Sequence, residues 1–174
     1  MHAFRRFAIV SFSVVIAFIA SLFIIVSISS KLPKEGKIAS DFRAYRASYE
    51  RVRTMLSEDK GVEGVAPWGI QLEGSPLWKV PPEGGMPANR YQEYLSLLKE
   101  IGASRVSQER GPLEVSFGVW ESGWGGNTRH VNISWLEREP PNTAISLDAF
   151  YRTDKPRRPS YVHIDGNWYI WADW

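Results

Sequence analysis

The sequence predicts an α+β protein with an N-terminal transmembrane helix, followed by an antiparallel sheet of about five strands with two amphipathic helices packed on one face. Three patterns lead to this prediction. An uncharged apolar run lies near the start of the chain, apolar residues at helical spacing follow it, and apolar and polar residues alternate in the C-terminal half. Sequential strands joined by short turns pair antiparallel, and amphipathic helices need a surface to cover, so the α+β class follows.

The apolar run extends from Ala8 to Ser29 and contains 22 residues without a charged residue, a proline or a glycine. A helix of that length rises about 33 Å, enough to cross a hydrocarbon core of about 30 Å. Fourteen of these residues are Ile, Val, Leu or Phe, and each favours membrane insertion by roughly 0.3 to 0.6 kcal/mol. We therefore expect a single-pass signal-anchor helix at residues 8–29, with the lipid bilayer as a partner.

Arg5 and Arg6 precede this run in a short head, residues 1–7. The positive-inside rule keeps such a head in the cytoplasm, so we expect the soluble domain on the extracytoplasmic side, which is the periplasm in a bacterium. Basic residues soon after the run argue for the opposite orientation, so the topology stays open: they are Lys31, Lys34, Lys37, Arg43 and Arg46.

A cleaved signal peptide is the alternative to a retained anchor, because Ser27 and Ser29 are small residues at the spacing of a peptidase site. The apolar core is longer than the roughly 7 to 15 residues of a signal peptide, which favours retention. Ser13, Ala17 and Ser21 form a stripe of small residues that would allow weak self-association between membrane helices.

The rest of the chain has the length of one domain, which we place at residues 40–174 after a linker at residues 30–39. Apart from Arg5 and Arg6, 19 basic residues balance 19 acidic residues. A neutral domain lacks the basic face that nucleic-acid binding requires. The absence of cysteine excludes disulfide frameworks, thiol nucleophiles and cysteine metal sites.

Two segments have the spacing of amphipathic helices. The first is expected at residues 40–60, with Ser40 as its N-cap and Gly61 as its stop, and the second at residues 88–101, where Gly102 ends it. The apolar stripe of the first helix consists of Ile38, Phe42, Tyr45, Tyr49, Val52 and Leu56.

The strands follow from alternation and from turn residues. Residues 61–86 are rich in Gly and Pro, and we expect one or two short strands there. Alternation predicts a hairpin with strands near 113–119 and 131–135, and a further strand near 145–151. The last pair, near 161–164 and 168–174, joins through Asp165-Gly166, a hairpin signal.

Aromatic residues occupy both faces of the last expected strand, where Trp168 alternates with Tyr169 and Trp171. A central strand covered on both sides explains this pattern. An exposed groove explains it as well, if these rings and the hairpin residues Trp120 and Trp124 line a binding surface.

Patterns that would indicate catalysis are weak. Ser122 follows Glu121 but does not stand in a Gly-x-Ser-x-Gly elbow, and no base is fixed near it by the sequence. Glu121 and Asp148 are the only pair of carboxylates that we nominate for glycoside hydrolysis. We predict no catalytic residue.

A metal site built from His163, Asp165 and His130 is equally weakly indicated. Asp165 is already explained as a turn residue, and nothing resembles the His-Glu-x-x-His motif. We predict neither a metal nor another cofactor.

We therefore expect a membrane-anchored, non-catalytic domain that acts by protein–protein contact, as an accessory subunit of an envelope assembly or an inhibitor of a toxin. The candidate partner contacts are Trp120 and Trp124, with Arg157 and Arg158 from the basic segment 154–159. The alternative is a carbohydrate-binding or carbohydrate-cleaving domain that acts on a surface polymer.

Overall fold

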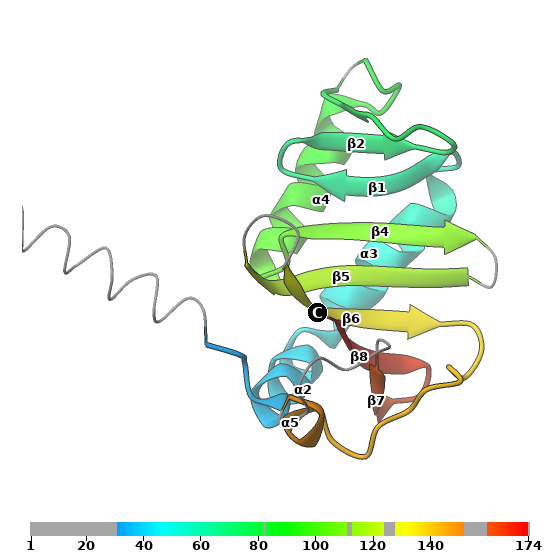
Figure 1. Ribbon diagram of the computed structural model, residues 1–174. Helices are drawn as coiled ribbons and strands as arrows, with labels where there is room; N and C mark the ends of the chain where they lie inside the picture. The colour runs from blue at the N-terminus through cyan, green and yellow to red at the C-terminus, as the bar shows by residue number, and fades with distance from the viewer. Residues whose placement is uncertain (1–30, 82, 111–112, 124–127, 152–159, 174) are drawn as a thin grey trace, which may run out of the picture. The chain divides into compact units, whose positions relative to one another are not determined.

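The computed structural model describes residues 31–81, 83–110, 113–123, 128–151 and 160–173 (Figure 1). The predicted membrane span from Ala8 to Ser29 lies outside the described residues. Among the helices that the structure does describe, none has the length and apolar character needed to span a bilayer.

Eight strands of the described chain form one antiparallel sheet in the order β3-β2-β1-β4-β5-β6-β8-β7. Hairpins account for most of the pairing, while β1 pairs with β4 and β6 pairs with β8 to join them into one sheet. The strands are β1 Val62–Ala66, β2 Gly69–Leu72, β3 Trp78–Lys79, β4 Arg105–Arg110, β5 Leu113–Ser122, β6 Arg129–Leu136, β7 Ser160–Asp165 and β8 Trp168–Asp173.

The predicted fold class is therefore wrong. We expected about five strands, two amphipathic helices and an N-terminal transmembrane helix, whereas the described residues form eight strands and four helices, and none of these helices could span a membrane. The strands were undercounted because β3 has two residues and β4 has a single apolar one, Val106. Neither segment contains enough apolar residues to show an alternation of apolar and polar positions.

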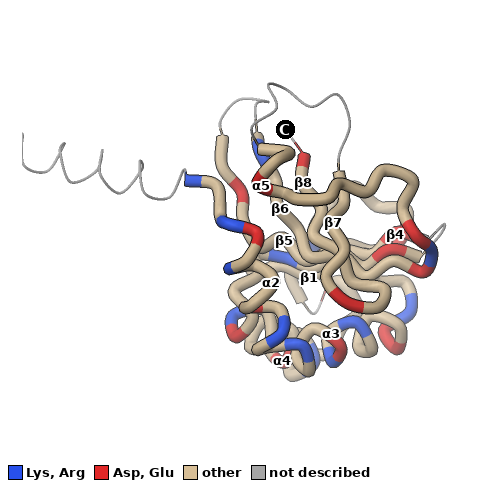
Figure 2. Tube along the Cα trace, turned by 90° about the horizontal axis from the view of Figure 1, so that it is seen from below, with Lys and Arg blue, Asp and Glu red and all other residues tan. Residues whose placement is uncertain are grey.

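Three of the described helices, α2 Glu35–Ala44, α3 Arg46–Glu58 and α4 Ala88–Glu100, lie on the same side of the sheet (Figure 2). The helix α4 coincides with the second predicted helix, and Gly102 follows it with a positive φ of 69°. The first predicted helix is two helices, because Tyr45 leaves the helical conformation at φ −113° and ψ 19°.

The strand expected near 145–151 is instead the short helix α5, Leu147–Phe150. The side chain of Ser146 caps it by accepting a hydrogen bond from the backbone N–H of Ala149 at 3.4 Å. The capping serine stops the extended conformation here, although the alternation of apolar residues favours a strand.

An aromatic cluster forms the centre of the core between the helices and the sheet. The ring centroid of Trp168 in β8 lies close to those of three other aromatic residues. The distances are 5.1 Å to Phe42 of α2, 5.8 Å to Tyr49 of α3 and 5.9 Å to Phe117 of β5. Trp168 is only 1% exposed, and its indole N–H donates a hydrogen bond to Glu50 Oε1 at 2.9 Å. The cluster thus joins two helices to two strands.

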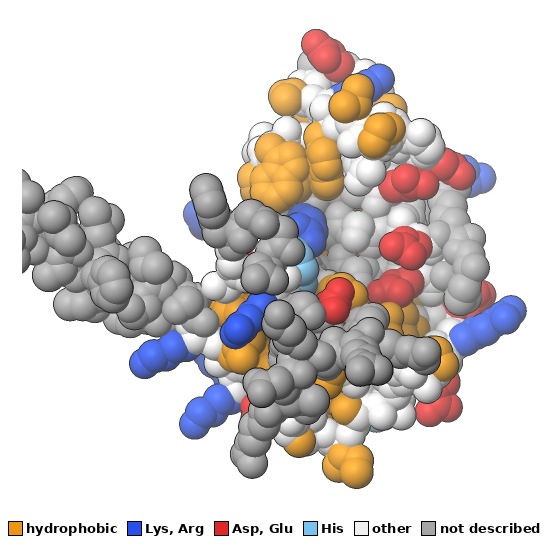
Figure 3. All heavy atoms as spheres, in the orientation of Figure 1, with side chains coloured by type: hydrophobic (Ala, Val, Ile, Leu, Met, Phe, Trp, Pro, Cys, Tyr) orange, Lys and Arg blue, Asp and Glu red, His pale blue; other side chains and the backbone are white. Residues whose placement is uncertain are grey.

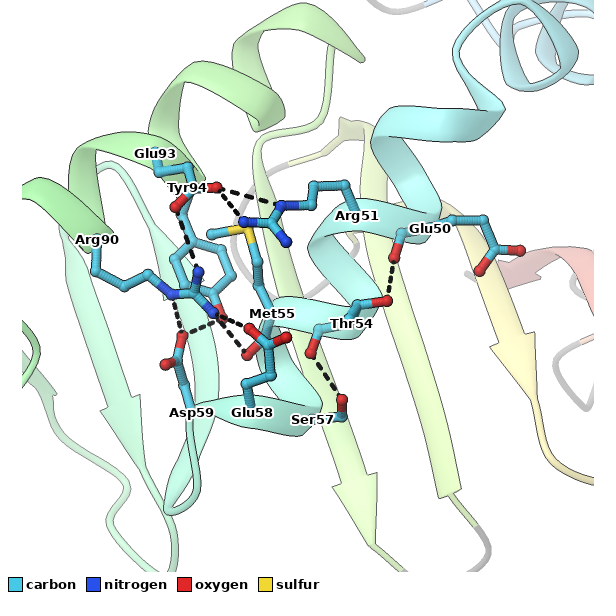
Figure 4. A network of polar contacts seen from close by, with 10 residues as sticks. All are labelled: Glu50, Arg51, Thr54, Met55, Ser57, Glu58, Asp59, Arg90, Glu93 and Tyr94. Atoms are coloured by element: carbon cyan, nitrogen blue, oxygen red, sulfur yellow. Dashed lines mark hydrogen bonds and ion pairs between the residues drawn. The ribbon is translucent and has the colours of Figure 1, made fainter.

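A polar network connects α3 with α4 at the surface of the helix layer (Figure 4). Arg90 donates to Asp59 Oδ2 and to Glu58 Oε2, both at 2.8 Å. The hydroxyl of Tyr94 donates to the same Asp59 oxygen at 2.7 Å. Because its partners lie within one helix layer, we interpret this network as a structural clamp and not as a binding site.

Candidate binding face

The sheet has one face packed against the helices and one opposite face, which we call the outer face. Side chains alternate between these faces along each strand. The helix-facing positions carry fully buried apolar side chains such as Val106, Phe117, Ile133 and Ile170. The outer face therefore contains the residues that alternate with them.

One row of cross-strand partners crosses the whole outer face, with one residue from each of the described strands. The side chains at the centre of this outer row are small and mostly polar, and those toward its ends are aromatic or large. From β3 to β7 the row is Trp78, Gln71, Gly64, Ser107, Ser116, Ser134, Tyr169 and His163.

The hydroxyls at the centre of the outer row bond to one another. Ser116 Oγ donates to Glu114 Oε1 at 2.9 Å and also contacts Ser134 Oγ, and Ser134 is fully buried. Each of these groups has its partner within the sheet. The arrangement is that of a structural hydrogen-bond network, not of an activated nucleophile.

A charged cluster lies on the outer face near the end of β5. Glu121 Oε2 is 3.3 Å from Arg105 Nη1 and 3.8 Å from His130 Nδ1. The structure thus brings together Glu121, which we considered for catalysis, and His130, which we considered as a metal ligand. Ser122, the next residue in β5, faces the opposite side of the sheet and does not join them.

The other nominated groups do not converge in the structure. His163 Nε2 lies 2.8 Å from the carbonyl of Gly166, and Asp165 is ion-paired with Arg46. Asp148 accepts a hydrogen bond from the backbone N–H of Glu35 at 3.3 Å, whereas Glu121 contacts Arg105 and His130. Among the described residues, no group of three His, Asp or Glu side chains is placed to hold a metal ion.

Exposed apolar side chains gather at the β3 end of the sheet, and we call them the edge patch: Trp68, Leu77, Trp78 and Val80. Trp68 is 51% exposed, Leu77 67% and Val80 62%, and Trp78 is half-buried. The rings of Trp68 and Trp78 lie 5.6 Å apart in an edge-to-face arrangement. Figure 3, which views the outer face, shows hydrophobic side chains gathered over this end of the sheet.

The predicted partner contacts have a different location. Trp120 pairs with Val131 in the sheet, and its partly buried side chain packs against the hydrophobic core. Trp124, Arg157 and Arg158 lie outside the described residues. We expected one or two short strands within residues 61–86 but no exposed surface there, so the edge patch was not predicted, although the segment Pro76-Leu-Trp-Lys-Val-Pro81 contains three of its apolar residues.

An open pocket of about 450 Å³ lies between the α3–β1 turn, the end of β2 and residues 84–87. Its lining includes the acidic residues Asp59 and Glu73 and the glycines Gly84 and Gly85. Asp59 already bonds to Arg90 and Tyr94, so its charge is neutralised within the protein. The edge patch is therefore the stronger candidate for a binding site.

Comparison of the chain with known protein families, curated proteins and solved structures found no match. The edge patch and the outer row are thus the features from which a function can be argued.

Proposed function

We propose that this protein is a non-catalytic interaction domain that binds a partner protein through the edge patch and is held at a membrane by its apolar segment, residues 8–29. The domain would lie on the extracytoplasmic side and act as an accessory subunit of an envelope assembly or as an inhibitor of a toxin. The observation that carries this proposal is the exposure of Trp68, Leu77 and Val80 at one edge of the sheet.

The two edges of the sheet differ in how their backbone groups are used. At the β7 edge, the N–H of Tyr161 donates to the carbonyl of Asn142 at 3.0 Å, and its carbonyl accepts from the N–H of Ala144 at 2.7 Å. At the β3 edge, Trp78 and Lys79 pair with β2 on one side, and no strand of the described residues pairs with their other side. β3 is only two residues long and contains the exposed Lys79, features that protect a sheet edge against strand addition. The exposed apolar side chains, and not the free backbone, therefore favour a partner at this edge.

The composition of the edge patch favours a protein over a polysaccharide. Sugars stack on flat aromatic rings, whereas the exposed Leu77 and Val80 add branched aliphatic surface on either side of Trp78 in the chain. Tryptophan surrounded by aliphatic side chains is typical of the energetic centre of a protein interface.

Carbohydrate binding is the second candidate, and the outer row favours it. At the β3 end of the row, half-buried Trp78 and half-buried Ser107 offer a ring and a hydroxyl, whereas Tyr169 is only 7% exposed and Ser116 already bonds within the sheet. An aromatic ring and a hydroxyl on the same face are groups that recognise a sugar.

A photo-cross-linking amino acid at Leu77 of the full-length chain, in the cells that produce it, tests the proposal. We expect one cross-linked partner of defined mass from Leu77 and none from the same amino acid at Ser57, an exposed position on α3. Replacement of Trp68 by alanine should weaken the purified complex by about tenfold or more, because a central tryptophan is a typical hot spot.

Equal cross-linking from Leu77 and Ser57 would contradict a specific protein interface. Retention of the chain on an insoluble glycan, abolished by Trp78→Ala but not by Leu77→Ala, would support the carbohydrate alternative instead.

A further inference from the structure

The end of the domain opposite the edge patch is formed by the start of α2 and by α5, which are held together by Glu35. The backbone N–H of Leu147 donates to Glu35 Oε2 at 2.7 Å, and the backbone N–H of Glu35 donates to Asp148 Oδ1 at 3.3 Å. These two hydrogen bonds place residues 145–149 beside the first turn of α2. Figure 1 shows α2 and α5 together at one end of the sheet, and β1 and β2 at the other.

The surface of this end combines an apolar side chain with basic ones. Ile145 is 102% exposed, the highest value among the large hydrophobic side chains of the described residues. Ala149 on α5 is also exposed, as are Lys34 and Lys37 at the start of α2. A fully exposed isoleucine at the same end of the domain as Lys34 and Lys37, of which Lys37 is also ion-paired with Asp41, suits the boundary between lipid headgroups and acyl chains, where lysine side chains reach the phosphates.

The length of chain before α2 limits how far this end can lie from a membrane. The folded unit begins at Pro33 and α2 at Glu35, so residues 30–34 separate the apolar segment from the helix. Five extended residues span at most about 18 Å. A tether this short gives the start of α2 a high effective concentration at the bilayer surface.

We propose that the end of the domain formed by Lys34, Lys37, Ile145 and Ala149 docks on the bilayer surface and so fixes the orientation of the domain. The occupant of this surface is a lipid bilayer with anionic headgroups. Ile145 enters the headgroup region, and the two lysines contact phosphates. This inference rests on the membrane attachment in the proposed function, but it does not depend on the identity of the protein partner.

Such docking directs the edge patch away from the membrane. The strands β7 and β3 are the two edges of the sheet, with seven strand spacings between them, which correspond to about 34 Å. A partner protein would then reach Trp68 and Leu77 without competition from lipid.

The experiment uses the full-length chain, which contains no cysteine, so single cysteines can be introduced for labelling. Ile145→Cys and the control Leu77→Cys, both at exposed positions, carry an environment-sensitive fluorophore. The proteins are reconstituted into vesicles of phosphatidylcholine and phosphatidylglycerol that contain nitroxide-labelled lipid. We expect at least about twofold stronger quenching at position 145 than at position 77, because only the first lies within reach of the headgroups.

A charge-reversal pair then tests the role of the lysines. Lys34→Glu combined with Lys37→Glu should lower the quenching at position 145, since each basic residue favours docking on an anionic surface about fivefold. Lys99→Glu, at an exposed position near the end of α4, should leave the quenching at position 145 unchanged.

The outcomes separate the two proposals. Chain that remains with the vesicles but shows equal quenching at positions 145 and 77 would overturn the docking inference and leave the membrane attachment intact. Chain that separates from the vesicles with its first 30 residues present would overturn the attachment itself. Quenching at position 145 that survives the double charge reversal would remove the lysines from the docking surface.

Discussion

At the scale of single residues, the geometry of the edge patch depends on glycines that let β3 approach its neighbours. Gly69 has a φ of 148°, and a Cβ atom added there would lie 2.7 Å from the carbonyl oxygen of Lys79. A Cβ atom on Gly64 would lie 3.0 Å from the ring of Trp78. A larger residue at Gly69 must therefore displace the backbone of β3, and one at Gly64 must shift the Trp78 ring by a few tenths of an ångström.

We expect Gly69→Ala to lower the free energy of unfolding by about 2 to 3 kcal/mol, since it adds a backbone clash to an unfavourable φ. Gly74→Ala is the matched control, because Gly74 also has a positive φ, 72°, but no atom within 4 Å of an added Cβ. Gly74→Ala should lower the free energy of unfolding by only about 1 to 2 kcal/mol. Urea denaturation of the full-length chain in mild detergent measures both, and equal losses would contradict the crowding at Gly69.

At the scale of elements, the break between α2 and α3 decides which residues of the first apolar stripe are buried. A continuous helix would bury Tyr45 with its neighbours, but the break at this residue leaves Tyr45 41% exposed. Phe42 before the break and Tyr49 after it are buried and lie 5.3 Å apart. The change of direction allows both rings to contact Trp168.

The break predicts that alanine substitutions of two aromatic residues three positions apart will change the free energy of unfolding by very different amounts. Phe42→Ala should lower the free energy of unfolding by about 3 to 5 kcal/mol, because it leaves a cavity beside Trp168. Tyr45→Ala should change it by less than about 0.5 kcal/mol, as expected for a surface position. Urea midpoints with fluorescence detection compare the two variants, and a large loss from Tyr45→Ala would favour a continuous helix.

At the scale of the whole molecule, tyrosines buried in the helix layer and the sheet make the stability of the fold depend on pH in the alkaline range. Burial is the main cause that raises the pKa of Tyr49 and of Tyr94 well above the usual value of 10.0. Burial, with the nearby charges of Glu114 and Glu109, raises the pKa of Tyr161 to about 12. The folded protein therefore holds these phenol protons more tightly than the unfolded chain does.

The stability that these tyrosines contribute is complete below their unfolded pKa and is lost as the pH rises toward the folded values. We expect the urea midpoint to be constant near neutral pH and to fall between pH about 10 and pH about 12. Tyr161→Phe should make this fall shallower, since one of the titrating groups is removed. A midpoint that does not change over this range would contradict the raised pKa values, and tyrosinate absorbance provides an independent measure.

Local patterns predicted the elements that are long and regular. The helix α4 and the hairpins β5–β6 and β7–β8 follow the periodicities read from the sequence. The turn of the last hairpin is displaced by one residue, because Asp165 pairs with Trp168 and leaves Gly166 and Asn167 in the turn. The short elements β3, β4 and α5 were missed because each acquires its conformation from neighbouring strands or from a single cap.

Three features follow from the amino-acid sequence alone: an uncharged apolar segment at residues 8–29, a neutral remainder without cysteine, and a surplus of tryptophan. Which aromatic residues reach solvent depends instead on tertiary contacts. Trp120 packs against the core, whereas Trp68 is half exposed at the sheet edge. The physical reason is that exposure depends on which strands lie beside a residue, and the pairing of β3, β2 and β1 follows from contacts that no local spacing specifies.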